Sequence, residues 1–133
     1  MIEKGACAVV REVLAHNGIR YIRRMPGEAQ MAAPEDGRAL AEACFEEDIN
    51  LVLIPGGCLA PSFFRLATGT AGEVLQKLSN YNLRAAAVID PSQIRGKFRD
   101  FLVETNRGGT FRAFSDEESA AAWLTAGADR DQP

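Results

Sequence analysis

Two short runs of apolar residues place the strongest constraint on the fold. Residues 51–54 (LVLI) are continuously apolar and stop at Pro55-Gly56-Gly57. Residues 83–89 (LRAAAVI) would place apolar side chains on both faces of a strand, and Asp90-Pro91 would end this strand. A strand with two apolar faces is typical of the interior of a parallel sheet. We therefore expect two adjacent parallel strands that are covered by helices on both sides, or by helices on one side and a partner subunit on the other.

Two helices are predicted beside these strands. Residues 34–47 begin with Pro34 and two acidic residues, which favour a helix start, and should end near Asp48. Their expected buried stripe is Leu40, Ala43 and Cys44, with Phe45 as a further candidate. Residues 70–80 begin with Thr70 and Glu73 in a capping-box pattern. Apolar residues follow at helical spacing, and we expect them to be buried: Ala71, Val74, Leu75 and Leu78.

The rest of the chain extends this alternation. Residues 19–25 read as a strand whose arginines, 20, 23 and 24, face solvent; Pro26-Gly27 and residues 28–31 would complete an edge hairpin. A helix is expected at 94–105, a strand at 110–114, and a helix from a Ser115/Glu118 capping box through Leu124. Residues 1–17 fit either a helix or a strand. The order predicts one α/β domain over residues 1–126, a mostly parallel sheet with helices packed on it, and a flexible tail at 127–133.

Composition narrows the classes of protein that the chain can belong to. Its 133 residues carry a net charge of −3, from 15 basic and 18 acidic side chains, which gives no general reason to bind nucleic acid or a membrane surface. No apolar run approaches the length of a membrane span. Three widely separated cysteines, Cys7, Cys44 and Cys58, indicate free thiols and a cytoplasmic protein. No residue pattern indicates a cofactor or a metal site.

A family resemblance rests on several motifs together. FFRLATGTAGEVLQKLSNY is followed by an alanine-rich strand that ends at Asp90, then by FLVETNRGG and a closing FRAF strand. This combination resembles a bacterial family known as domain of unknown function 4180, over roughly residues 18–124. Asn82 stands where a basic residue is usual in that family, and Thr105 where serine is usual. The resemblance implies a fold but no established activity.

The order of elements also resembles the anti-sigma-factor antagonist (STAS) fold, whose members often regulate partner proteins. In that fold a phosphorylatable serine or threonine can lie at the helix start after the third strand. Thr68 and Thr70 occupy the corresponding place here. The alternative is that one of these threonines only caps the helix.

Polar residues near the ends of the later elements form the second group of candidates. These residues are Asn80, Tyr81, Arg84, Asp90, Glu104, Asn106 and Arg107. Their side chains could line a ligand site, because the ends of helices and strands meet at the edges of an α/β sheet. The alternative, which we favour, is that they chiefly cap helices and form ion pairs that join the end of one helix to the next. We predict a non-catalytic binding or regulatory module that forms a homo-oligomer, with a dimer favoured, or binds a protein partner. The alternative is an enzyme that acts on a small molecule through the Asn80, Tyr81, Glu104 and Asn106 group.

Overall fold

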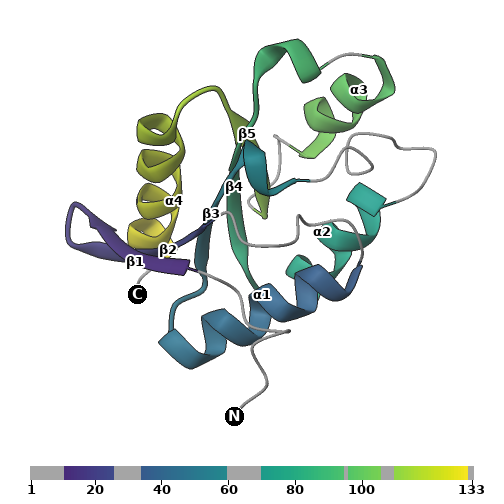
Figure 1. The fold of residues 1–133 in the computed structure, drawn as a ribbon. Helices are drawn as coiled ribbons and strands as arrows, with labels where there is room; N and C mark the ends of the chain where they lie inside the picture. Colours follow the sequence, from purple (N-terminus) through teal and green to yellow (C-terminus); the bar gives the residue numbers. More distant parts are fainter. Residues whose placement is uncertain (1–10, 26–33, 60–69, 95, 106–109, 132–133) are drawn as a thin grey trace.

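A five-stranded sheet in the order β1-β2-β3-β4-β5 runs through the molecule (Figure 1). This computed structural model describes residues 11–25, 34–59, 70–94, 96–105 and 110–131. The strands are β1 (Arg11–His16), β2 (Ile19–Arg24), β3 (Leu51–Pro55), β4 (Arg84–Val88) and β5 (Phe111–Phe114). The helices are α1 (Pro34–Glu47), α2 (Thr70–Asn80), α3 (Gly96–Thr105) and α4 (Glu117–Asp131), with short 3-10 turns η2 (Gly56–Cys58) and η5 (Pro91–Gln93).

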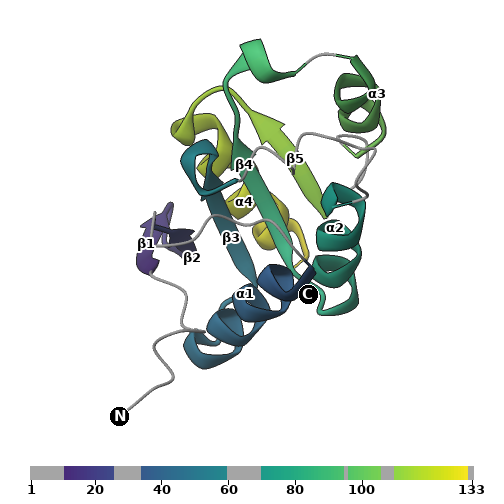
Figure 2. The ribbon, with the colours of Figure 1, turned by 45° about the vertical axis from the view of Figure 1, so that its right-hand side comes forward.

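The two apolar strands lie in the middle of the sheet. β3 and β4 are parallel neighbours, paired from Leu51 with Arg84 to Pro55 with Val88. Their central side chains are buried on both faces. Because neighbouring parallel strands are joined by right-handed crossovers, α1 and α2 pack side by side on one face, while α4 crosses the other (Figure 2). The prediction of an interior parallel pair between helix layers is confirmed, as is the mixed, mostly parallel α/β fold.

The opening hairpin differs from its prediction. β2 pairs antiparallel with β1 on one side and parallel with β3 on the other, so it is not an edge strand. The turn is Asn17-Gly18, with φ of 54° and 80°, a pair of left-handed residues that suits a tight hairpin turn. Residues 28–31, the predicted partner strand, lie outside the described residues. Residues 11–16 are a strand, which settles part of the N-terminal segment.

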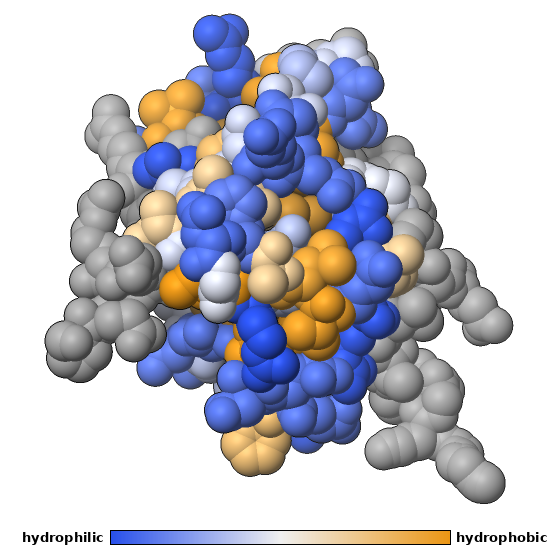
Figure 3. Space-filling view, turned by 90° about the vertical axis from the view of Figure 1, so that its left-hand side faces the viewer, coloured by the Kyte–Doolittle hydropathy of each residue, from blue (hydrophilic) through white to orange (hydrophobic). Residues whose placement is uncertain are grey.

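The three arginines of β2 do not all face solvent, although the sequence predicted that they would. Arg24 is buried, Arg23 is half-buried and Arg20 is exposed, because β2 lies inside the sheet rather than at its edge. Figure 3 shows the side of the molecule that bears the β1–β2 hairpin, where apolar side chains gather in the middle among hydrophilic ones.

The buried face of α1 also needs one correction. Leu40, Ala43 and Cys44 are buried as expected, but Phe45 points into solvent with 89% of its surface exposed. At about 100° per residue, Phe45 lies about 140° around the helix from Leu40, well outside the stripe. On α2 only Leu78 of the four expected core residues is described, and it is buried; the side chains of Ala71, Val74 and Leu75 lie outside the described residues.

The C-terminal elements are close to their expected positions, with shifted ends. α3 begins at Gly96 rather than Ile94, because the turn η5 occupies residues 91–93. The cap of α4 is Asp116, not Ser115: its carboxylate accepts a hydrogen bond of 2.7 Å from the Ser119 N–H. α4 runs to Asp131 and so continues beyond Leu124 into residues assigned to the tail. In the described part of the chain, no helix is both long enough and apolar enough to cross a membrane.

Candidate functional site

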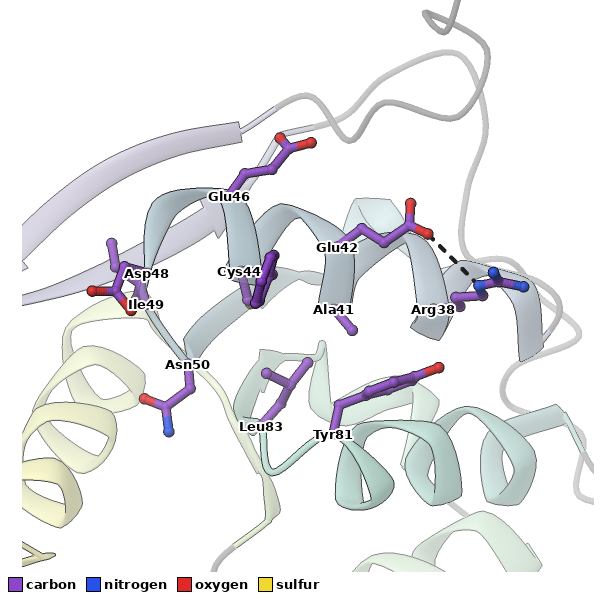
Figure 4. Close-up of a pocket in the computed structure, with 11 residues that line it drawn as sticks. Arg38, Ala41, Glu42, Cys44, Glu46, Asp48, Ile49, Asn50, Tyr81 and Leu83 are labelled. Carbon is purple, nitrogen blue, oxygen red and sulfur yellow. Dashed lines mark ion pairs between the residues drawn. The ribbon is translucent and has the colours of Figure 1, made fainter.

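A groove lies where the second half of α1 faces the turn between α2 and β4 (Figure 4). Its volume is about 710 Å³. Apolar side chains line one part of it: Ala41, Phe45, Ile49, Tyr81 and Leu83. Polar side chains line the rest: Arg38, Glu42, Glu46, Asp48 and Asn50. The groove is therefore amphipathic, with aromatic surface beside charge.

Two matching helix ends build this groove. At the end of α1, the Ile49 N–H donates to the Cys44 carbonyl (3.0 Å) and Asp48 has a φ of 58°. At the end of α2, the Leu83 N–H donates to the Leu78 carbonyl (2.9 Å) and Asn82 has a φ of 60°. Both ends are Schellman motifs, in which a left-handed residue reverses the chain. Each motif sends the chain directly into β3 or β4.

The second of these motifs places Tyr81 at the groove. Tyr81 follows the last residue of α2, and Figure 4 shows its ring extending beneath α1 toward Arg38. Tyr81 is 47% exposed. On the α1 side, Phe45 is the most exposed large apolar residue of the described chain. Leaving an aromatic side chain in water instead of burying it costs about 2 kcal/mol. The groove thus holds two aromatic groups whose burial is available to a binding partner.

The charges at the groove are mostly acidic. Glu42, Glu46 and Asp48 carry three negative charges, against one positive charge on Arg38. Arg38 Nε lies 3.6 Å from Glu42 Oε2, one helical turn away. Arg11 of β1 reaches α1 from outside the groove, with Nη2 2.8 Å from Glu46 Oε1. The surface therefore keeps an excess of carboxylates next to its aromatic side chains.

The groove lacks an activated nucleophile among its described residues. Its one thiol, Cys44, is buried against the core, and burial raises the pKa of that thiol to about 12. A thiol with such a pKa stays protonated at neutral pH and is a poor nucleophile or metal ligand. The described residues contain no group of three or more side chains arranged to hold a metal ion.

The polar candidates from the sequence are dispersed where the structure describes them. Asn80 is exposed and accepts a hydrogen bond of 3.0 Å from Gln76 Nε2, within α2. Glu104 is exposed on α3, which both views place away from the C-terminal end of α2 (Figures 1 and 2). Thr68, Asn106 and Arg107 lie outside the described residues. Thr70 is the first residue of α2, but its side chain is not among those described.

Asp90 has a local structural role. Its carboxylate accepts a hydrogen bond of 2.9 Å from the Ser92 N–H and caps the turn η5. Hydrogen bonding to Ser92 holds the pKa of Asp90 below its usual value, and the slight desolvation of this carboxylate acts in the opposite direction. Asp90 still lies just beyond the carboxyl end of β4, the edge at which open α/β sheets bind ligands.

Sequence patterns did not identify two features of the folded chain. Phe45 is a further candidate for the buried stripe in the sequence, although its place on the helical wheel points outward. The guanidinium of Arg84 lies over the Trp123 ring, 3.7 Å from its centroid, and Arg84 Nη2 donates to the Trp123 carbonyl (3.1 Å). This contact joins β4 to α4, residues 39 positions apart, so no local pattern could have indicated it.

Comparison with known proteins supports the resemblance found in the sequence. A family model described as "Domain of unknown function (DUF4180)" matches residues 16–124. Neither a curated protein nor a solved structure matches the chain. The likeness to STAS proteins therefore stays a prediction.

Proposed function

Because the chain belongs to the DUF4180 family, which brings no known activity, its role has to be inferred from its surfaces, and we propose that it is a non-catalytic protein-binding module. Its binding surface is the groove between α1 and the α2–β4 turn. The ligand is a helical segment of a partner protein with one apolar face and basic flanks.

The exposure of Phe45 is the observation that carries this proposal. Phe45 is 89% exposed on a helix whose opposite face is fully buried, and Tyr81 lies at the same groove. Buried aromatic anchors dominate the energetics of protein interfaces. Burying Phe45 and Tyr81 together would contribute several kcal/mol, at about 25 cal/mol for each Å² of apolar surface. This is enough for a specific but reversible complex.

The shape and charge of the groove favour a helical, basic partner. An amphipathic helix that enters a groove presents apolar anchors at positions i, i+4 and i+7. The acidic side chains Glu42, Glu46 and Asp48 would lie against its flanks. Complementary charge increases the association rate and disfavours acidic partners. The segment therefore carries lysine or arginine beside its apolar anchors.

The alternative, an enzyme built on Asn80, Tyr81, Glu104 and Asn106, has less support. General acid–base catalysis needs a base within about 3 Å of the group that it deprotonates. Asn80 is engaged by Gln76. Glu104 lies on α3, which Figure 1 shows apart from the C-terminal end of α2, the helix that Tyr81 follows. A regulatory role through phosphorylation of Thr68 or Thr70 is compatible with the binding module, and mass spectrometry of protein purified from cells would detect it.

Two synthetic helical peptides test the proposal. Both carry leucine at i, i+4 and i+7 on an alanine-rich background that favours a helix, and the positions that flank the leucines are lysine in one and glutamate in the other. We expect the lysine peptide to bind, as measured by fluorescence anisotropy, and the glutamate peptide to bind far more weakly. Phe45→Ser should weaken binding of the lysine peptide at least about tenfold, because it removes an aromatic anchor.

Val103→Ser is the matched control for this experiment. Val103 is also an exposed apolar residue, 49% exposed, but it lies on α3, away from the groove. Its substitution should leave peptide binding unchanged. Equal binding of the two peptides, or equal effects of Phe45→Ser and Val103→Ser, would show that the peptides adhere to apolar surface in general and would contradict the proposal.

A further inference from the structure

The outer edge of β1 carries an inference of its own. β1 pairs with β2 along its whole length, and among the described residues no strand pairs with its other edge. An edge strand presents a row of backbone N–H and C=O groups that can pair with another chain. We propose that β1 pairs antiparallel with β1 of a second copy of this chain, about a two-fold axis, so that the two sheets become continuous.

The hairpin turn determines which backbone groups face outward. In a two-residue hairpin, the residues that flank the turn, here His16 and Ile19, form a hydrogen-bonded pair. Since such pairs alternate along the ladder, His16, Leu14 and Glu12 direct their N–H and C=O groups toward β2. The groups of Ala15, Val13 and Arg11 point toward the open edge. A second copy must meet these three residues with its own outward-facing residues.

This requirement leaves few registers, and one of them is self-complementary. A two-fold axis at Leu14 sets Val13 opposite Ala15 of the second copy, and Leu14 opposite its counterpart. Glu12 then lies opposite the second copy's His16, a carboxylate facing an imidazole. An axis at Val13 would instead set Glu12 opposite Leu14, a charge against an apolar side chain. Directly opposed side chains stabilise a sheet when both are apolar or when their charges are complementary. The axis at Leu14 is therefore favoured.

The side chains of β1 are already held in place for this pairing. On the α4 side, Glu12 Oε1 lies 3.8 Å from Arg23 Nη1, and His16 Nδ1 lies 3.2 Å from Thr125 Oγ1. On the α1 side, Arg11 is bonded to Glu46 and Glu47. A two-fold axis perpendicular to the sheet keeps each side chain on its own face. The edge therefore needs little rearrangement to receive a second copy.

The centre of β1 also lacks the usual protection of an edge strand. Natural edges are blunted by lysine, proline, a bulge or an inward-pointing charge. The central residues Val13, Leu14 and Ala15 are apolar, and Val13 is 38% exposed. Its register with β2 runs without interruption from Arg11 to His16. This apolar and regular edge, which no other described strand covers, is suited to pairing with its own copy.

Light scattering and disulfide crosslinking test the interface. We expect the wild-type protein to have twice the 14.4 kDa mass of one chain. Val13→Lys should raise the dissociation constant of the dimer at least about tenfold, because symmetry places two lysines at the interface. Val13→Thr, which keeps a β-branched side chain without charge, should remain a dimer. Circular dichroism of each variant verifies that the monomer is folded.

Crosslinking distinguishes the register and uses a nearly wild-type interface. In a Cys7→Ser background, Leu14→Cys should form a dimer disulfide, because opposed residues in a non-hydrogen-bonded pair have Cα atoms about 4.5 Å apart. Ala15→Cys should not, since its counterpart lies two residues along the strand, at about 8 Å. A monomeric wild-type protein, a Val13→Lys dimer of unchanged affinity, or crosslinking of Ala15→Cys as fast as Leu14→Cys would each overturn the proposal.

Discussion

The contrast between Leu40 and Phe45 gives the sharpest test of how α1 is oriented. Both are large apolar residues on one helix, and a composition-based view would place both in the core. In the structure Leu40 is completely buried and Phe45 is 89% exposed. We therefore compare Leu40→Ala with Phe45→Ala, two truncations to the same residue five positions apart.

The structure predicts very different losses of stability. Leu40→Ala leaves a cavity between α1 and the sheet, which costs about 2–5 kcal/mol of unfolding free energy. Phe45 has about a tenth of its surface covered, so its truncation loses about 0.3 kcal/mol of burial. Alanine has a higher helix propensity than phenylalanine by about 0.5 kcal/mol, which offsets that loss. Phe45→Ala should thus be neutral or slightly stabilising.

Urea unfolding measures both values. Far-UV circular dichroism reports the helices, and fluorescence reports Trp123, the single tryptophan, which packs on Phe114 and Arg84. Unchanged slopes of the two unfolding curves would show that the comparison is valid. A loss of more than about 1 kcal/mol in Phe45→Ala would refute the outward orientation of Phe45, and with it the basis of the groove.

Two further predictions concern stability alone. Gly56→Ala should lower the unfolding free energy by about 1–3 kcal/mol, because the added Cβ would lie 2.5 Å from the Val88 carbonyl oxygen. Gly57→Ala is the control, because its Cβ would meet nothing within 4 Å, and thermal melts of the two variants compare their stability. Glu117 accepts two hydrogen bonds from Arg23, of 3.0 and 2.7 Å, which lower its pKa below the usual value of a glutamate. Glu117→Gln should lower the unfolding free energy by about 0.5 kcal/mol at pH 7. This difference from the wild type should disappear as the pH falls through the lowered pKa of Glu117, because the wild-type carboxylate then becomes protonated. Urea unfolding across that pH range measures it, and a difference that does not change with pH would contradict a contribution from the ion pair.

The sequence by itself determined the elements whose signals are local. Apolar runs bounded by Pro55-Gly56 and Asp90-Pro91 identified the two central strands, because a strand covered on both faces needs apolar residues at successive positions. The start of α1 at Pro34 and its end near Asp48 also followed from local chemistry. These signals depend on the period of the backbone and on the residues that end it, and tertiary contacts do not change them.

Only the tertiary structure decided which surfaces these elements leave open. Residues 11–16 are compatible with a helix or a strand until β2 supplies a partner, and that pairing places β1 at the edge of the described sheet. The groove arises because two helix ends, at Asp48 and Asn82, lie side by side on one face of the sheet although they are distant in the sequence. The contact of Arg84 with Trp123 likewise depends on how α4 crosses β4. Long-range pairing depends on the free energy of the whole packed chain, so local periodicity predicts the elements but not the surfaces that they form together.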